Sequence, residues 1–374
     1  MLALASSARF QERNFTDIFG KMKNSPVNTK RDKLKVAIGP VYDEFGGVSQ
    51  HILGIKKSSF HQISALPSKF SRTVLGKRGQ RIWLYKMEKI GLSRYDVIHS
   101  HVSPWFTNLC LSSRTNTCKW VHTYHTLYFK EDYPKGLKPE QKRINRTLVE
   151  IASKADVKIS ISKWLHDYLL EKYAIQTEVI PNGIDLRQCD RANPDRFVRK
   201  YALRDFVLFV GSLDPIKNPQ LFAELALRMP EYKFVMIGRN LDAIHIKNEY
   251  GISVFKNLFL LNEMKHNDVL NAISACDAFV MTSKREGIPT VLLEAMGMGK
   301  PVVAPAHSGC KEVIHSNDYG FLYEPDSLDD LVEQTKRALN SKHVGKRSME
   351  RVARHYDWKI LARKIDSVYE SLYK

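Results

Sequence analysis

Residues 278–305 read AFVMTSKREGIPTVLLEAMGMGKPVVAP, and this stretch decides the fold. Its beginning, 278–282, and its end, 301–304, are short apolar runs of the kind that form buried strands. Between them, 290–296 has the apolar spacing of a helix, and Pro289 is suited to the first turn of that helix. A strand, a helix and a second strand in this order predict a parallel pair joined by a right-handed crossover.

The same alternation of strands and helices runs along most of the chain. Further apolar runs of strand length occur at 35–40, 96–100, 120–123, 157–160, 179–181, 206–211 and 233–238. Helical spacing occurs at 49–57, 141–154, 219–229 and 268–276. A linker at 185–201 separates the two series. The sequence therefore predicts an α/β protein with two doubly wound, Rossmann-like domains that face each other across a cleft.

The composition is that of an ordinary globular protein with two domains. The chain has 374 residues, of which 43% are hydrophobic and 26% charged. No apolar stretch approaches the roughly 20 residues that cross a bilayer, and the first 13 residues are too polar for a secretory signal. Five cysteines without a CxxC pair predict reduced thiols in a cytoplasmic protein, with no disulfide framework or zinc site among them.

The net charge of +18 is concentrated in the first half of the chain. Residues 1–185 hold 30 basic and 16 acidic residues, whereas residues 186–374 hold 28 and 24. Solubility alone is one explanation, and a partner that is anionic is another. Zinc-finger spacing and the aromatic signature of an RNA-recognition motif are both missing from the sequence, which argues against nucleic acid as that partner.

Residues 56–94 contain ten basic residues and a single acidic one, Glu88, with aromatic and apolar residues between them. This pattern suits the surface of an anionic membrane, where each basic residue contributes about 1 kcal/mol. The alternatives are a solvated face and a site for a phosphate-rich soluble acceptor. The pattern predicts a protein held peripherally on the cytoplasmic face of a membrane. The ten are Lys56, Lys57, Lys69, Arg72, Lys77, Arg78, Arg81, Lys86, Lys89 and Arg94.

Two glutamates mark the loop and helix that follow the strand at 278–282. Glu286 lies in the loop, and Glu294 lies eight positions later on the helix. Gly287 permits a close approach of a ligand to the backbone, and the free N–H groups of a helix that starts after Pro289 favour an anion such as a diphosphate. A carboxylate can also accept two hydrogen bonds from the vicinal diol of a sugar. The pattern predicts that a loop carboxylate, a phosphate-binding helix start and a second carboxylate converge on one point, and two solvated glutamates are the alternative.

Five motifs in this order resemble glycosyltransferase family 4, a family of retaining GT-B glycosyltransferases also described as glycosyl transferases group 1. The resemblance runs from about residue 35 to the C-terminus. It is carried by EGIPTVLLEAMGMGKPVVAP at 286–305, together with IPNGID at 180–185, VGSLDPIKN at 210–218, SGCKEVI at 308–314 and YGFLYEPDSLDDL at 319–331. It implies an enzyme that moves a hexose-type sugar from a nucleotide-sugar donor to an acceptor, either a glycan or a lipid-linked molecule, and retains the anomeric configuration.

The resemblance also implies a division of the chain. An N-terminal extension would occupy 1–32, an acceptor-binding domain 33–185 and a donor-binding domain 186–357. A C-terminal helix at about 358–374 would pack back on the acceptor domain.

The family pattern assigns roles to single residues. Glu286 would face the donor hexose beside the reacting carbon, and Glu294 would bind the ribose hydroxyls. The backbone between these two residues would hold hexose hydroxyls and phosphate, through Gly287, Ile288, Pro289 and Thr290.

One cation of the family pattern is replaced. The family places an arginine directly after the glycine of VGSL and a lysine five residues later, and together they neutralise the diphosphate. Here Lys217 supplies the lysine, but Ser212 stands at the arginine position. Arg239, which follows the strand at 233–238, is a candidate substitute, and Lys284 and Arg285 are two others.

In the first half, Gly46 and Gly47 lie between a strand and a helix, where paired glycines let the backbone approach a phosphate or sugar. A plain tight turn is the alternative. His125 comes just after the strand at 120–123, and the resemblance places it near the donor sugar and the scissile bond, although an isolated histidine is more often structural. His122 has a weaker claim than His125. His99 and His101 are interpreted as part of the cleft wall.

No DxD motif follows a strand, and such a motif is what many metal-dependent transferases use at the diphosphate. Lys217 and helix-start amides can offset the same charge, so no metal and no cofactor are expected. Two rival functions stay open. One is a catalytically silent subunit that binds a nucleotide sugar, which Ser212 favours, and the other is a GT-B epimerase.

Overall fold

The computed structural model describes residues 32–42, 46–67, 91–251, 255–341 and 344–374. Residues 34–374 form one compact unit. Most of the expected N-terminal extension therefore lies outside the described residues. So do the residues of the basic run 56–94 that fall between 68 and 90, including Lys77, Arg78 and Arg81.

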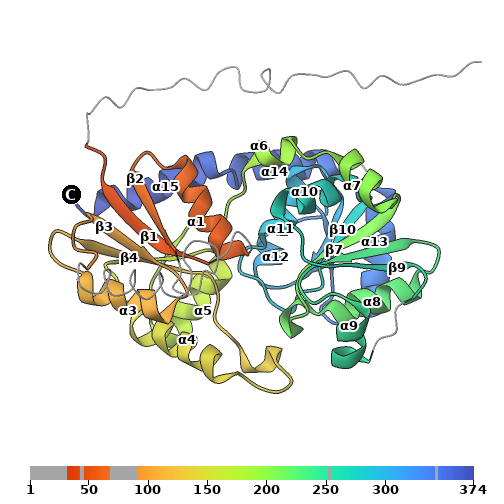
Figure 1. Cartoon of the computed structure of the whole chain (residues 1–374), viewed down its shortest axis with the longest axis horizontal. Helices are drawn as coiled ribbons and strands as arrows, with labels where there is room; N and C mark the ends of the chain where they lie inside the picture. The colour runs from red at the N-terminus through yellow and green to blue at the C-terminus, as the bar shows by residue number, and fades with distance from the viewer. Residues whose placement is uncertain (1–31, 43–45, 68–90, 252–254, 342–343) are drawn as a thin grey trace, which may run out of the picture. The chain divides into compact units, whose positions relative to one another are not determined.

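The first half of the compact unit is built on a parallel sheet of six strands (Figure 1). Its strands are β1 (Lys35–Val41), β2 (Gln62–Pro67), β3 (Val97–Ser100), β4 (Lys119–Tyr124), β5 (Val157–Ser160) and β6 (Glu178–Val179). Its helices are α1 (Gly47–Ser58), α3 (Pro104–Ser113), α4 (Pro139–Glu150) and α5 (Lys163–Tyr173), with short turns η2 (Lys130–Asp132) and η3 (Ala152–Lys154). β2 was not predicted, because its sequence QISALP is no continuous apolar run and the strand is only half-buried.

The second half repeats this plan with another parallel sheet of six strands. Its strands are β7 (Phe206–Val210), β8 (Lys233–Ile237), β9 (Leu258–Leu261), β10 (Ala278–Val280), β11 (Val302–Pro305) and β12 (Phe321–Tyr323). Its helices are α8 (Pro219–Arg228), α9 (Ala243–Tyr250), α10 (His266–Ala275), α11 (Thr290–Gly297), α12 (Ser308–Val313), α13 (Leu328–Asn340) and α14 (Val344–His355), with the turn η4 (Pro215–Lys217). The predicted α/β fold with two Rossmann-like domains is confirmed.

Both faces of the second sheet are covered because neighbouring residues of each strand point to opposite sides. In β7, Phe206 and Leu208 enter a core with α10, α11 and α12. Val207 and Phe209 enter another core, with α8, α9 and α13. The first sheet is covered in the same way, by α1 on one face and α3, α4 and α5 on the other.

The strand orders fix where a ligand can bind. The first sheet has the order β2-β1-β3-β4-β5-β6, and the second has β9-β8-β7-β10-β11-β12. In each sheet, strands are added first on one side of the first strand and then on its other side. The strand order therefore reverses between β1 and β3 in the first sheet and between β7 and β10 in the second. Loops at the carboxyl ends of such strands diverge and leave a crevice. The loops after β1, β3, β7 and β10 are therefore the ones that can form a site.

Two chain segments connect the halves, and they pair with each other. Ile184 and Asp357 form an isolated parallel bridge, in which the Ile184 N–H donates to the Tyr356 carbonyl at 2.9 Å and the Trp358 N–H to the Ile184 carbonyl at 3.1 Å. After the second crossing, α15 (Trp358–Ser371) joins the core of the first half beside α1. Figure 1 shows this last helix beside α1, far from α13.

The segment 185–201 was predicted to be a linker, and it does lie where the chain passes between the halves, but it is not irregular. It contains two helices, α6 (Leu186–Asp190) and α7 (Pro194–Tyr201). Asp185 and Asn193 cap them through their side chains, and Phe197 is buried in a core of the second half. A polar stretch with two capping residues and one deeply buried aromatic therefore carries too little apolar periodicity to reveal its helices.

Candidate functional site

The turn that follows β7 and the loop that follows β10 are tied together at their backbones. The Thr282 hydroxyl donates to the carbonyl oxygens of Lys217 at 3.1 Å and Asn218 at 2.8 Å. The N–H of Lys284 donates to the Ile216 carbonyl at 2.8 Å. These bonds fix the positions of Lys217 and the following loop relative to each other.

Lys217 and Glu286 form an ion pair at this junction. The Lys217 Nζ donates to Glu286 Oε1 at 2.7 Å, with the two side chains 32% and 13% exposed. Burial lowers the pKa of Lys217, but attraction to Glu286 and the hydrogen bond outweigh it and raise the pKa above its usual value. Lys217 therefore stays protonated and can attract an anion such as a diphosphate.

Two residues at the start of α12 hold the backbone of Glu286. Its N–H donates to the Ser308 Oγ at 3.2 Å, and its carbonyl accepts from the Gly309 N–H at 3.0 Å. A Cβ on Gly309 would lie 1.3 Å from the Gly287 carbonyl oxygen, so only glycine fits there. The SGCKEVI motif thus supports the loop that carries Glu286.

Gly287 and Ile288 contact the first half of the chain. A Cβ on Gly287 would lie 2.5 Å from Ile161 Cδ1 and 2.7 Å from the His125 carbonyl oxygen. The Ile288 carbonyl accepts a hydrogen bond from Asn182 Nδ2 at 2.8 Å. The sequence analysis attributed Gly287 to the approach of a ligand, whereas the structure shows that it also allows the two halves to touch.

Helix α11 follows this loop and carries Glu294. Pro289 is its N-cap and Thr290 its first residue. Glu294 is 5% exposed, and its Oε1 lies 2.7 Å from His266 Nε2 at the start of α10. Burial lowers the pKa of His266, but the bond to Glu294 and the attraction of its charge prevail and raise it. One carboxylate oxygen is held by this contact, which leaves the other for a ligand.

A cavity of about 300 Å³ lies beside Glu294. Helix α1 lines one side of it with Gln50 and Lys57, and the start of α10 lines another with Lys265 and His266. The cavity therefore lies between the two halves, next to the residue predicted to bind ribose.

The candidate replacements for the missing arginine are engaged in different ways. Ser212 lies partly buried directly after β7. Arg239 is 62% exposed and pairs with Glu263 at 3.0 Å. Lys284 is partly buried, and its backbone bonds the turn that carries Lys217. Arg285 reaches across to the first half, and among the described residues none of these three side chains bonds the side chain of Lys217 or Glu286.

Arg285 joins the halves. Its Nε donates to Asp132 Oδ2 at 2.9 Å and its guanidinium lies 3.4 Å from Glu131. The same guanidinium stacks over the Phe129 ring, with 4.0 Å between its central carbon and the ring centroid. Asp132 is only 4% exposed. Arg285 is therefore a structural contact between the halves, and its sequence position beside Glu286 did not reveal this.

The loop before α1 leaves its glycines open. Gly46 has φ of 105°, which favours glycine. A Cβ on Gly46 or Gly47 would meet no atom within 4 Å among the described residues. These two glycines are exposed, so their backbone is available to a ligand.

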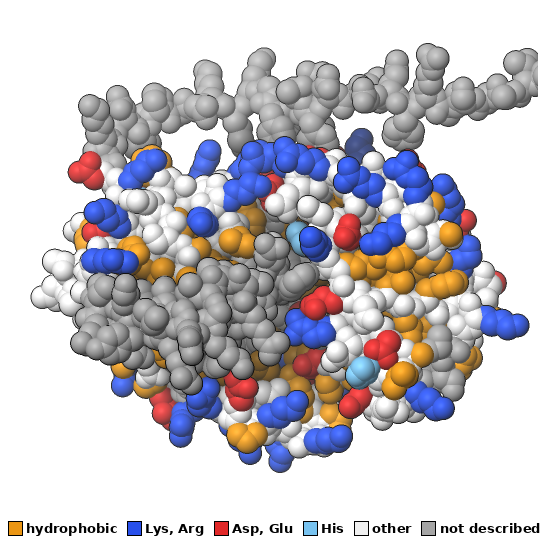
Figure 2. All heavy atoms as spheres, in the orientation of Figure 1, with side chains coloured by type: hydrophobic (Ala, Val, Ile, Leu, Met, Phe, Trp, Pro, Cys, Tyr) orange, Lys and Arg blue, Asp and Glu red, His pale blue; other side chains and the backbone are white. Residues whose placement is uncertain are grey.

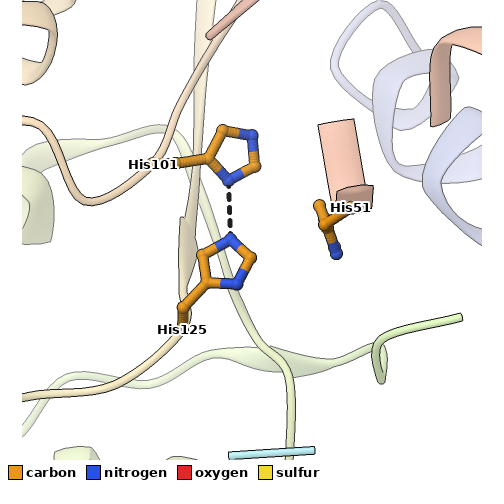
Figure 3. Close-up of side chains that lie close together, drawn as sticks. All are labelled: His51, His101 and His125. Carbon is orange, nitrogen blue, oxygen red and sulfur yellow. Dashed lines mark hydrogen bonds between the residues drawn. The ribbon is translucent and has the colours of Figure 1, made fainter. Parts of the chain in front are cut away.

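His125, predicted as a site residue, belongs to a buried cluster of three histidines at the carboxyl edge of the first sheet (Figure 3). His101 Nδ1 lies 2.9 Å from His125 Nε2. The ring of His51, from α1, lies edge-on to that of His125, with 4.8 Å between centroids. Burial lowers the pKa of His51 to about 4 and those of His101 and His125 well below their usual value. All three imidazoles are therefore neutral at neutral pH.

His99 and His101 were interpreted as part of the cleft wall, but both are fully buried. His99 bonds Tyr369 of α15 at 2.7 Å and Thr123 at 2.8 Å. His122 is buried against Ser100, with 2.7 Å between its Nδ1 and the hydroxyl. His99 and His122 therefore act in the packing of the first half.

Sequence reasoning missed several residues of this site. His51 was not predicted, and Asn182 was included only as part of IPNGID. His266 and Asp132 carried no signal at all, because each matters only through a partner more than 25 positions away. The strand order of the fold, rather than any local sequence pattern, determines which residues meet in a site of this kind.

Comparisons with known proteins agree with the sequence motifs. Residues 57–188 match the family model described as Glycosyltransferase Family 4, and residues 191–369 match the one described as Glycosyl transferases group 1. The two matches meet at the segment where the chain passes from one half to the other.

Curated relatives include two bacterial transferases. One, from Escherichia coli, is named UDP-Gal:alpha-D-GlcNAc-diphosphoundecaprenol alpha-1,3-galactosyltransferase, and it is 28% identical over 70% of each chain. The other, from Campylobacter jejuni, is named N-acetylgalactosamine-N,N'-diacetylbacillosaminyl-diphospho-undecaprenol 4-alpha-N-acetylgalactosaminyltransferase, and it is 27% identical over 54% of this chain and 56% of its own length.

Solved structures show the same fold. The Anabaena protein HepE in complex with UDP-glucose has a TM-score of 0.70 and 16% identity, and the match covers 90% of this chain and 100% of that one. Sucrose-phosphate synthase from Thermosynechococcus elongatus has a TM-score of 0.70 and 19% identity, over 91% of this chain and 99% of that one.

Proposed function

Because the chain belongs to the GT-B glycosyltransferases of group 1 and family 4, we propose that it is a retaining, metal-independent enzyme. It moves a hexose-type sugar from a nucleotide-sugar donor to an acceptor. The observation that carries this proposal is the Lys217–Glu286 ion pair at the point where the second sheet reverses its strand order. The Glu286 carboxylate, the Lys217 ammonium group and the N-terminal end of α11 meet there, beside the first half of the chain.

The residues divide the work as follows. Lys217, protonated and held by Glu286, stabilises the diphosphate as it leaves, and the N-terminal end of α11 adds its free N–H groups. Glu286 stabilises the positive charge that develops on the reacting sugar carbon. The carboxylate of Glu294 binds the ribose hydroxyls beside the 300 Å³ cavity. His125 and the backbone at Gly46 and Gly47 complete the donor site from the first half.

The retaining outcome follows a front-face route. The C–O bond to the diphosphate breaks, and the acceptor oxygen forms its bond to the same carbon from the same side. The leaving phosphate oxygen takes the proton of the acceptor hydroxyl. Glu286 is already paired with Lys217 at 2.7 Å, which suits it to electrostatic stabilisation rather than to a covalent intermediate.

A lipid-linked acceptor is part of the proposal. Both bacterial relatives carry diphosphoundecaprenol in the names of their acceptors. No described helix is long and apolar enough to cross a bilayer. The proposal is that the enzyme meets such an acceptor peripherally, on the cytoplasmic face of a membrane. Figure 2 shows Lys and Arg side chains along the upper edge of one face, where Figure 1 places α6, α14 and α15. Helix α14 has four basic residues and one acidic residue, Glu350. The basic residues are Lys346, Arg347, Arg351 and Arg354.

A donor screen tests the function. UDP-, GDP- and ADP-sugars are offered with and without a diphosphopolyprenol-linked sugar, and the release of nucleotide is measured in EDTA. We expect acceptor-dependent release that EDTA does not reduce. Binding without release would instead support the silent subunit that Ser212 favours, and conversion of the donor sugar without an acceptor would support an epimerase. Activity that EDTA abolishes and Mg²⁺ restores would contradict metal independence.

Membrane binding has its own test. Co-sedimentation with anionic vesicles should fall as salt is added, and neutral vesicles should not pellet the protein. Equal pelleting with both kinds of vesicle would contradict an electrostatic attachment.

A further inference from the structure

The histidine cluster contains one ring nitrogen, His51 Nε2, whose protonation state follows from the hydrogen bonds of its neighbours. Asn182 Nδ2 donates to the Ile288 carbonyl at 2.8 Å, so the Asn182 Oδ1 must act as an acceptor. His51 Nδ1 lies 2.9 Å from that oxygen and must therefore carry the ring proton. His51 Nε2 is then an unprotonated lone pair.

That lone pair, on His51 Nε2, is buried without a hydrogen-bond partner among the described residues. A buried polar atom left unpaired costs about 1–3 kcal/mol, and such an atom in a native protein commonly marks an ion or water. The cluster is therefore incomplete as a purely structural element.

We propose that His51, His101 and His125 bind one divalent transition-metal ion, with Zn²⁺ as the best fit, and that the bound ion inhibits sugar transfer.

The distances suit this ion after a small adjustment. One ligand nitrogen from each histidine can be chosen so that all three lie within 4.8 Å of one another. A tetrahedral zinc ion with bonds of about 2.0–2.1 Å needs its nitrogens roughly 3.4 Å apart. The metal would replace the 2.9 Å contact between His101 and His125, which would open slightly, while His51 would move inward by roughly an ångström.

The ligand types select among metals. Three imidazoles without a carboxylate suit Zn²⁺, Cu²⁺ or Ni²⁺, whereas Mg²⁺ and Ca²⁺ prefer oxygen ligands. Three histidines with a fourth position left for water form a known kind of zinc site. The bond from His51 Nδ1 to Asn182 is also the outer-shell contact that metal-binding histidines usually make, because it fixes the tautomer and the ring orientation.

Inhibition follows from the place of the cluster. The inhibition rests on the proposed function, in which His125 contacts the donor sugar. A metal on His125 would withdraw that ring from the sugar. Because the cluster also touches Ile288 through Asn182, an ion there would act on the loop that carries Glu286.

The test compares two buried histidines. His51→Gln removes a ligand, whereas His122→Gln changes a histidine that is equally buried, has an unpaired Nε2 among the described residues and stands outside the cluster. Zn²⁺ affinity is measured by competition with a chromogenic chelator. We expect one high-affinity Zn²⁺ per wild-type chain, unchanged affinity in His122→Gln and at least tenfold weaker binding in His51→Gln. Equal affinity in wild type and His51→Gln would overturn the site.

A second measurement does not depend on how the variants fold. Wild-type protein titrated with Co²⁺ should develop the intense visible absorption of a tetrahedral site, and Zn²⁺ should abolish it. A weak octahedral spectrum would overturn the site. In the transfer assay, Zn²⁺ should inhibit the wild type reversibly with EDTA and inhibit His51→Gln less. Zinc binding without any transfer activity would leave the metal site intact and refute the proposed function, and binding that leaves transfer unchanged would overturn the inhibition.

Discussion

Replacing Glu286 by glutamine removes the charge of one partner of the central ion pair and keeps its size. The two groups are 2.7 Å apart, and their Coulomb attraction at an effective dielectric constant of about 20 is about 6 kcal/mol before desolvation is counted. A positive charge developing on a sugar carbon nearby would feel the same carboxylate. Removal of one such preorganised group costs about 2.7–4 kcal/mol. We therefore expect kcat/KM to fall by two to three orders of magnitude.

The same substitution changes Lys217. Without the charge of Glu286, burial becomes the main influence on the ammonium group, and burial lowers its pKa. We therefore expect the alkaline limb of the pH–rate profile to move to lower pH in Glu286→Gln. Lys217→Met and the double variant complete a cycle, in which the two losses should be far from additive because the groups act together.

The assay is initial-rate release of nucleotide with a saturating acceptor. Asp329→Asn serves as a control, because it breaks an ion pair of the same length, Arg228–Asp329, whose carboxylate is 83% exposed. Such exposed pairs contribute little, so this variant should stay within about twofold of the wild type. Retention of more than a tenth of the wild-type kcat/KM by Glu286→Gln would refute the role given to Glu286.

Three further predictions concern other contacts of the site. Glu294→Ala should raise KM for the donor and weaken the binding of free nucleotide measured by calorimetry, since a ribose contact acts in ground and transition states alike. Unchanged nucleotide binding would rule that contact out. Asp132→Asn should destabilise the protein by on the order of 3 kcal/mol because it unpairs Arg285, whereas Glu131→Gln, with a carboxylate 66% exposed, should change the melting temperature little. His266→Gln should melt below the wild type by a margin that is largest below about pH 6.5 and disappears as the pH rises through the raised pKa of His266; a margin independent of pH would contradict the pair with Glu294.

The strands of both sheets could be predicted because buried parallel strands are continuous apolar runs. The runs at 35–40 and 206–211 match β1 and β7 within a residue. β9 and β12, of four and three residues, were not predicted, although each is an apolar run. The helices of 185–201 were missed because their stability comes from caps and from Phe197 rather than from a long apolar stripe.

The candidate site was predictable only where its residues share a motif. Lys217 and Glu286 were both expected from the family pattern, but their 2.7 Å contact spans 69 positions and follows from the strand order of the second sheet. The cluster of His51, His101 and His125 draws on α1 and on the ends of β3 and β4. Spacing along the chain carries no information about that convergence.

Four consecutive residues show why the site cannot be assigned to one half alone. Arg285, Gly287 and Ile288 all contact the first half, through Asp132, the His125 carbonyl and Asn182. Glu286, in the middle of them, is bonded instead to Lys217 of the second half.

The position of the Glu286 carboxylate therefore depends on contacts made on both sides of it by the other half of the chain. Separation of the halves would break all three contacts together and leave Glu286 held only by Lys217 and the start of α12. The Glu294 carboxylate keeps its position without such contacts, since its partner His266 lies in the same half. In the proposed function, the placement of Glu286 therefore requires that the two halves be in contact, whereas the placement of Glu294 does not.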